Sequence, residues 1–221
     1  MGAEQPLGAE LSAYISARRP SPLEASVGRV LDVTLAASAL IILAPMLLLA
    51  MLAIWSDNPR ASVLFRQVRY GYSGKPFILF KLRTMVPDAE ALKSTYANLS
   101  VENGPGFKIL GDPRITAVGR ILRRYYIDEI PQFFNVLRGE MSIVGPRANS
   151  YNPLGYEPWQ RVRLSVKPGM TGLWQTRLDK PLAFEERCKL DLEYIKHKGI
   201  LTDITIMLRT FWIVLVQPSG D

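Results

Sequence analysis

The pattern of apolar and polar residues divides the chain into one long uncharged segment and a more polar remainder. Residues 33–55 contain no formally charged side chain. A straight helix of that length would reach about 34 Å, which is enough to cross the hydrocarbon core of a bilayer. The segment is too long, and begins too far into the chain, for a typical cleaved signal peptide. We therefore expect a membrane helix and place its bounds at residues 28–56.

Two features bear on the kind of membrane helix. Pro45 lies near the middle, where it removes an amide donor and clashes with the carbonyl of Ile41. Basic residues flank both ends, and the positive-inside rule would keep both ends on the cytoplasmic side. These residues are Arg18, Arg19, Arg29, Arg60, Arg66, Arg69 and Lys75. A kinked helix that enters and leaves by the same face satisfies both features, and an ordinary signal-anchor helix with a tolerated proline is the alternative.

Shorter patterns predict the elements of the remainder. Residues 63–69 and 77–84 are rich in apolar and basic residues and flank the turn residues 71–74, which predicts a β-hairpin. Residues 167–172 read as a tight loop. Helices are expected at 88–99, 118–125, 131–138, 184–198 and 201–216. The last of these could be buried or could lie in the headgroup layer.

These elements predict a mostly α fold with a small β-hairpin, an α+β class. We divide the chain into a leader at 1–27, a re-entrant membrane helix at 28–56, and a catalytic domain at 57–221 that carries interfacial amphipathic helices. Residues 1–27 are rich in alanine, serine, proline and glutamate, which is typical of a surface-lying leader.

Composition and net charge restrict the kinds of partner and catalytic site that we expect. The net charge is +7, which favours an anionic partner: nucleic acid, the cytoplasmic leaflet, or a phosphorylated substrate. Cys188 is the only cysteine, so no intrachain disulfide can form. His197 is the only histidine, which argues against a histidine-based triad or a zinc site.

The adjacent carboxylates Asp128 and Glu129 are the strongest candidates for catalysis, because they lie among arginines just before the helix-starting Pro131. The arginines are Arg114, Arg120, Arg123, Arg124, Arg138 and Arg147. Arginine binds phosphate oxygens bidentately, and nearby cations keep a carboxylate ionised. An ionised aspartate can attack phosphorus, and a neighbouring glutamate can hold Mg²⁺. Alternatively, these arginines contact anionic lipid headgroups.

Four ordered blocks carry a family resemblance. They are residues 64–90, 112–147, 167–175, and 190–197 followed by Asp203. Over residues 28–216 the chain resembles the monotopic phosphoglycosyl transferases, bacterial sugar transferases that begin glycoconjugate assembly on undecaprenyl phosphate. That family has a re-entrant, proline-broken membrane helix, which favours the same interpretation of Pro45.

The resemblance implies roles for individual residues. Asp128 matches the catalytic nucleophile, and Glu129 matches the second catalytic carboxylate, which binds Mg²⁺. The implied substrate-binding residues are Arg123 at a phosphate, Pro146 and Arg147 near the nucleotide, and Lys81 and Arg83 as a basic pair after the hairpin. From the arginines around the carboxylates we add Arg114 to this substrate-binding set.

The implied reaction has two steps. Asp128 attacks the sugar-linked phosphate of a UDP-sugar and releases UMP, and a polyprenyl phosphate then takes the sugar phosphate from the enzyme. The expected location is the cytoplasmic face of the bacterial inner membrane, and the product would enter exopolysaccharide or other glycoconjugate synthesis. Anionic membrane lipids are expected partners, nucleic acid is not, and a homodimer is left open.

Three departures from the family pattern bear on this hypothesis. Tyr126 stands where the family usually has a small hydroxyl residue, and Ala148 replaces the second proline of a Pro-Arg-Pro element. After Gln175 the chain has TRLDKP where the family often has Gly-Arg. These departures leave a membrane-anchored adaptor without catalysis as one alternative. The high positive charge leaves a nucleic-acid-binding protein as another.

Overall fold

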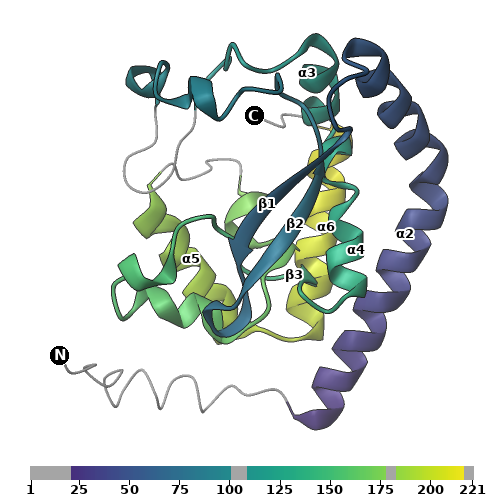
Figure 1. Cartoon of the computed structure of the whole chain (residues 1–221). Helices are drawn as coiled ribbons and strands as arrows, with labels where there is room; N and C mark the ends of the chain where they lie inside the picture. The colour runs from purple at the N-terminus through teal and green to yellow at the C-terminus, as the bar shows by residue number, and fades with distance from the viewer. Residues whose placement is uncertain (1–20, 101–108, 178–182, 217–221) are drawn as a thin grey trace.

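A computed structural model describes residues 21–100, 109–177 and 183–216, and within them the chain is mostly helical with two small sheets (Figure 1). The helices are α2 (Pro22–Asp57), α3 (Ala117–Arg124), α4 (Gln132–Leu137), α5 (Phe184–His197) and α6 (Ile200–Val216). The strands are β1 (Leu64–Tyr70), β2 (Pro76–Leu82), β3 (Ser142–Val144) and β4 (Gly169–Thr171). The expected mostly α fold with a small hairpin is confirmed. Residues 1–20 of the leader lie outside the described residues.

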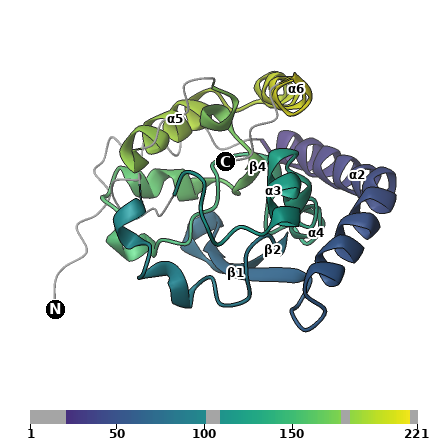
Figure 2. The same cartoon turned by 90° about the horizontal axis from the view of Figure 1, so that it is seen from above.

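Helix α2 is longer than the predicted membrane segment. It starts at Pro22 because the side chains of Ser21 and Glu24 form a capping box, so residues 22–27 are helical. Its 36 residues correspond to about 54 Å. Among the described residues it is the one helix long and apolar enough to cross a membrane. The helix continues through Pro45 and bends along the side of the body (Figures 1 and 2). The re-entrant arrangement stays a prediction.

The first half of α2 is bound to the rest of the molecule by polar side chains. Arg29 donates to the carbonyls of Val136 and Leu137 at 2.6 and 2.8 Å, at the end of α4 where helical carbonyls lack partners. One carboxylate oxygen of Asp32 accepts from the hydroxyl of Ser142 and the amide of Ile143 at 3.0 and 2.9 Å. This half of the helix is therefore docked on the body.

Strands β1 and β2 form the predicted antiparallel hairpin, with Leu64 opposite Leu82. The connecting turn uses positive φ angles at Ser73 and Gly74. A second, parallel pair joins β3 to β4, so the prediction of a loop at 167–172 was wrong for its central residues. At Gly169 a Cβ atom would overlap the amide nitrogen of Gly145, so this pairing requires glycine.

The prediction of a helix at 88–99 was also wrong. The segment forms only two short 3₁₀ helices, η2 (Ala91–Lys93) and η3 (Ala97–Leu99), and none of its side chains is buried. A helix of this length is marginal in water unless it buries an apolar face against the body.

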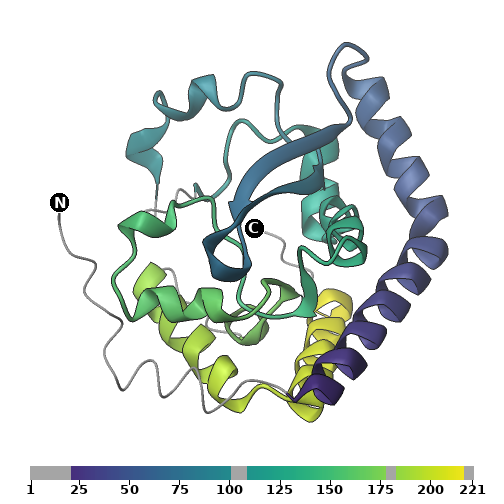
Figure 3. The same ribbon diagram turned by 60° about the horizontal axis from the view of Figure 1, so that its bottom comes forward.

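Three apolar clusters hold the elements together. The first joins α2 to β2 and α4 through Ala36, Leu79 and Val136. The second joins the far half of α2 to the hairpin and α3; it contains Ala50, Ile54, Leu82 and Leu122. The third packs α5 and α6 on the second sheet; it contains Val144, Tyr194, Ile195 and Ile206 (Figure 3). Helix α2 therefore contacts the same body with both of its halves.

Candidate active site

The carboxylate pair lies in the short 3₁₀ helix η4 (Ile127–Glu129), between α3 and α4, as the sequence predicted. The chain turns into η4 at Tyr126, whose φ of 57° lies in the left-handed region that only a few per cent of non-glycine residues occupy. Pro131 caps the start of α4. This sharp turn leaves Asp128 buried, with 6% of its surface exposed.

Two cations from separate segments meet at Glu129. The Lys81 Nζ atom on β2 lies 2.6 Å from Glu129 Oε1 and 3.8 Å from Asp128 Oδ2. Arg147, which follows β3, donates to Glu129 from both terminal nitrogens, at 2.5 and 3.5 Å. The fold therefore brings together four of the residues that the sequence predicted for the site.

The two adjacent carboxyl groups have opposite pKa shifts. Burial raises the pKa of Asp128, and the negative charge of Glu129 adds to this rise against the opposing effect of Lys81. Burial also disfavours the charge of Glu129, but Arg147 and Lys81 outweigh it and hold the pKa of Glu129 well below its usual range. Glu129 is thus a permanent anion, whereas Asp128 has an ionised form that its surroundings destabilise.

Arg123 reaches the same cluster from α3. Its Nε atom donates to the Thr84 hydroxyl at 2.9 Å, and its charge acts on the pKa of Asp128. Helix α3 lies close to the segment that carries Thr84, because Gly119 packs directly on the Thr84 carbonyl, where a Cβ atom would overlap. The structure therefore places Arg123 beside the carboxylates.

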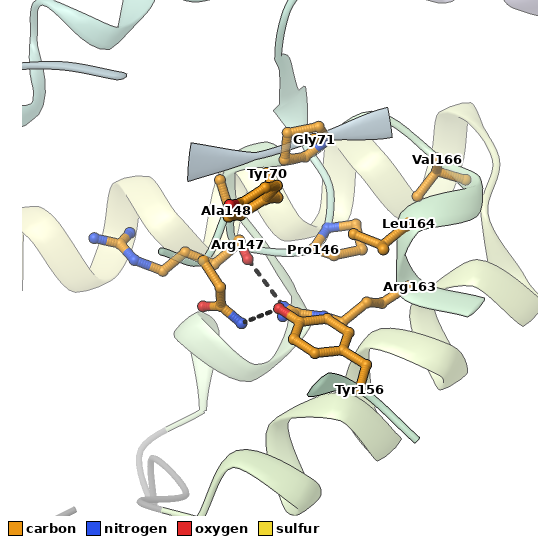
Figure 4. Close-up of a pocket in the computed structure, with 11 residues that line it drawn as sticks. Tyr70, Gly71, Pro146, Arg147, Ala148, Tyr156, Arg163, Leu164 and Val166 are labelled. Carbon is orange, nitrogen blue, oxygen red and sulfur yellow. Dashed lines mark hydrogen bonds between the residues drawn. The ribbon is translucent and has the colours of Figure 1, made fainter. Parts of the chain in front are cut away.

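The backbone of Pro146 and Arg147 is anchored on two sides. The Pro146 carbonyl accepts from the Gly169 amide at 3.0 Å. The Arg147 carbonyl accepts from Arg163 at 2.9 Å, and Arg163 forms a buried ion pair with Asp191 at 2.6 Å. In Figure 4 the Arg147 side chain points away from Arg163. Arg163 therefore binds the backbone of Arg147, whereas Glu129 binds its side chain.

Two predicted residues lie apart from this cluster. Arg83 donates to the Ser62 carbonyl at 2.5 Å and lines a separate cavity at the end of α2. Arg114 is buried and binds Asp112 at 2.6 Å, and these hydrogen bonds hold the pKa of Asp112 below its usual range. Within the described part of the chain, neither arginine forms an ion pair with Asp128 or Glu129.

The structure adds three residues that the sequence analysis did not assign to the site. Arg69 on β1 donates to the Ala148 carbonyl at 3.0 Å, next to Arg147. Arg163 and Asp191 form the buried pair that holds the backbone of Arg147. The basic content of the hairpin was a signal for Arg69, whereas no spacing in the sequence indicates the pairing of residues 163 and 191.

Residues 23–217 match a family model described as bacterial sugar transferase. The chain belongs to the bacterial sugar transferase family. This match includes every residue of the cluster just described, and it confirms the family resemblance.

Three relatives show how this bacterial sugar transferase compares in length. It is 40% identical over 196 residues to the galactosyl transferase CpsE of Streptococcus agalactiae, covering 87% of this chain and 43% of that protein. It is 41% identical over 203 residues to the UDP-glucose:undecaprenyl-phosphate glucose-1-phosphate transferase of Caulobacter vibrioides, covering 87% and 71%. It is 37% identical over 204 residues to the exopolysaccharide production protein PSS of Rhizobium leguminosarum, covering 87% and 96%. The chain thus spans less than half of the first relative and nearly all of the third.

The donor set of this bacterial sugar transferase restricts the metal that it could hold. Among the described residues, no three histidine, cysteine, aspartate or glutamate side chains lie close enough together to form a metal site. The oxygen donors at the centre are those of Asp128 and Glu129. One or two carboxylates together with substrate phosphates are the usual ligands of Mg²⁺, so the donor set fits this ion.

Proposed function

We propose that this chain transfers a sugar-1-phosphate from a UDP-sugar to a polyprenyl phosphate such as undecaprenyl phosphate, through a covalent phosphosugar on Asp128. The observation that carries the proposal is the buried Asp128 beside an ionised Glu129 that Lys81 and Arg147 hold in place. The Caulobacter relative is named for the transfer of glucose-1-phosphate from UDP-glucose to undecaprenyl phosphate, and the Rhizobium relative is named for exopolysaccharide production.

In the first step, a carboxylate oxygen of Asp128 forms a bond to the sugar-linked phosphorus. The bond from that phosphorus to the oxygen of UMP breaks, and UMP leaves with the electron pair. Arg123 and Arg147 lie where they can stabilise the charge that develops on the phosphate oxygens. Burial raises the pKa of Asp128, so a smaller fraction of this carboxyl group is ionised than at the surface, and the poorly solvated ionised form is the one that attacks phosphorus.

In the second step, a phosphate oxygen of the lipid attacks the same phosphorus. The bond to Asp128 breaks, its carboxylate is restored, and a sugar diphospholipid is released. Because the two substrates react one after the other, the soluble donor and the lipid acceptor need not occupy the site together.

Mg²⁺ is the cofactor that we propose, with Glu129 as the residue that would hold it. The lowered pKa of Glu129 keeps this ligand ionised at neutral pH. When bound, the ion would neutralise charge on the phosphate oxygens.

We also propose that the chain lies on the cytoplasmic face of the bacterial inner membrane with α2 as a re-entrant helix. Ala36 in one half of α2 and Ile54 in the other both pack on the same body. A helix that crossed about 30 Å of hydrocarbon would carry one end away from that body. The outer face of α6 would lie in the headgroup layer among anionic lipids; its exposed apolar residues are Ile200, Leu201, Ile204, Leu208, Phe211, Trp212, Leu215 and Val216.

Intact-protein mass spectrometry tests the covalent step. After incubation with a panel of UDP-sugars, the wild-type chain should gain the mass of one phosphosugar and release UMP. Asp128→Asn should show neither, and the matched control Asp88→Asn, which removes an exposed carboxylate, should behave as wild type. An inactive adaptor predicts no UMP from the wild-type chain, and an adduct on another residue would contradict the proposal.

A further inference from the structure

The proposed active site has more positive than negative charge. Lys81, Arg69, Arg123 and Arg147 all act electrostatically on Asp128 or Glu129, which are the two anions of the cluster. Glu129 already binds both Lys81 and Arg147. In the described residues, no carboxylate lies within ion-pair distance of Arg69 or Arg123. The four cations and two anions leave a surplus of about two positive charges. This surplus matches the negative charge of a nucleotide sugar's diphosphate.

Among these cations, Arg69 is held in place by hydrogen bonds to uncharged groups. Among the described residues, its guanidinium donates to neutral acceptors: the Ala148 carbonyl at 3.0 Å and the Gln67 side chain at 2.6 and 2.9 Å. The amide of Tyr70 donates to the Asn149 carbonyl at 3.0 Å, which ties this end of β1 to the segment after Arg147. The hydrogen bonds to the carbonyls of Ala148 and Asn149 therefore hold Arg69 next to Arg147.

The surroundings of Arg69 disfavour its charge. Burial lowers the pKa of Arg69 to about 10, and the positive charge of Arg147 also lowers it. Two guanidinium groups held together without enough acid to neutralise them are a common arrangement for binding phosphate oxygens.

We infer that Arg69 and Arg147 bind one phosphate group of the nucleotide between them, so that Arg69 is a substrate-binding residue. This inference rests on the proposed function and names a residue that contacts the UMP half of the donor. A small pocket adjoins Arg147, and its wall contains both polar and apolar side chains, among them Tyr70, Tyr156, Leu164 and Val166 (Figure 4). The surplus of about two positive charges in the cluster matches the diphosphate of the donor, so we assign the phosphate to the nucleotide rather than to the lipid.

Titration of the full-length protein in detergent with UMP tests the inference without requiring turnover. Arg69→Gln should weaken UMP binding at least about tenfold, because it removes charge-assisted hydrogen bonds to phosphate. Arg66→Gln is the matched control, since it makes the same change in net charge at an exposed position on the same strand. The control should bind UMP as the wild type does.

A second titration with a short, water-soluble prenyl phosphate distinguishes the two sources of phosphate. Arg69→Gln should leave prenyl phosphate binding within about twofold of wild type. Unchanged UMP affinity in Arg69→Gln would overturn the inference, and so would a loss confined to prenyl phosphate.

Arg69→Lys guards against a folding defect. It keeps the charge but loses the fork of donors, so its UMP affinity should fall between those of wild type and Arg69→Gln. If Arg69→Gln does not fold, a wild-type affinity in Arg69→Lys overturns the inference. A wild-type chain that forms no adduct would refute the proposed function, whereas the comparison of UMP affinities would still decide the role of Arg69.

Discussion

At the scale of single residues, Asp128 and Glu129 are neighbours in the chain but have different environments. Asp128 is buried, and among the described residues its ion-pair partner is Lys81, 3.8 Å away, whereas Glu129 binds both Lys81 and Arg147. Their roles in the proposal differ for this reason: the buried carboxylate attacks phosphorus and the paired one binds cations. The family resemblance indicated Arg123 and Arg147 for this site, whereas the sequence did not indicate that the two carboxylates would have different environments.

The opposite pKa shifts predict opposite effects on stability at neutral pH. The pKa of Asp128 is raised in the folded state, so its contribution to stability is present when it is protonated and is lost as the pH rises through the folded pKa. Asp128→Asn should therefore have a free energy of unfolding at pH 7.5 that is equal to or higher than that of wild type. This difference should shrink as the pH falls below the folded pKa of Asp128. Urea titrations in detergent at several pH values measure both effects.

Glu129→Gln is the comparison for this prediction. Because its pKa is lowered in the folded state, ionised Glu129 contributes stability above its unfolded pKa and loses it as the pH falls. The substitution should lower the free energy of unfolding by about 1–3 kcal/mol at neutral pH, since it weakens hydrogen bonds to two cations. Equal destabilisation by Asp128→Asn and Glu129→Gln would contradict the assigned environments.

At the scale of elements, the sequence correctly predicted those whose formation depends on residues close together in the chain. The hairpin follows from apolar and basic segments around a turn, and α5 ends where it was predicted, near His197. The helix expected at 88–99 did not form, and none of the side chains of that segment is buried in the body, so little packing is available to stabilise a helix. Strands β3 and β4 were missed because their parallel pairing joins segments that are distant in the sequence.

Helix α5 should stabilise the site through its buried ion pair. Asp191→Ala leaves Arg163 buried without its counter-charge, so it should lower the free energy of unfolding by about 3–5 kcal/mol. It should also slow adduct formation, because Arg163 holds the Arg147 backbone. Chemical denaturation and intact-protein mass spectrometry measure the two effects.

Glu193→Ala is the matched control on the same helix, since this carboxylate is exposed. Its free energy of unfolding should stay within about 0.5 kcal/mol of wild type. A similar unfolding midpoint for Asp191→Ala and Glu193→Ala would show that the buried pair does not carry the stability assigned to it.

At the scale of the whole molecule, α2 and the body form one unit. Arg29 and Asp32 bind the body near one end of the helix, and Ala50 and Ile54 pack on it near the other. The exposed surface of α2 between these contacts is apolar and includes Ile41, Ile42, Leu48, Leu49 and Leu52. This arrangement suits a helix that lies in one leaflet with its apolar side toward lipid.

Cysteine accessibility tests that topology. In Cys188→Ala the single-cysteine variants Ser26→Cys and Asp57→Cys place thiols near the two ends of α2. If the helix is re-entrant, a membrane-impermeant maleimide should label both in inverted vesicles and neither in intact spheroplasts. Lys196→Cys on the exposed side of α5 is the control for the cytoplasmic side. Labelling of the two ends from opposite sides would establish a single crossing.

The sequence by itself determined the apolar helix, the hairpin, the carboxylate pair and the family, because these depend on composition and on residues close together in the chain. The family resemblance also named basic residues for the site, but only the tertiary structure decided which of them meet the carboxylates and which do not. It brought Lys81, Arg123 and Arg147 to them, together with Arg69, and turned Arg83 and Arg114 toward other partners. The physical reason is that an arginine binds whichever acceptor the packed backbone places within reach, and sequence spacing does not specify that acceptor.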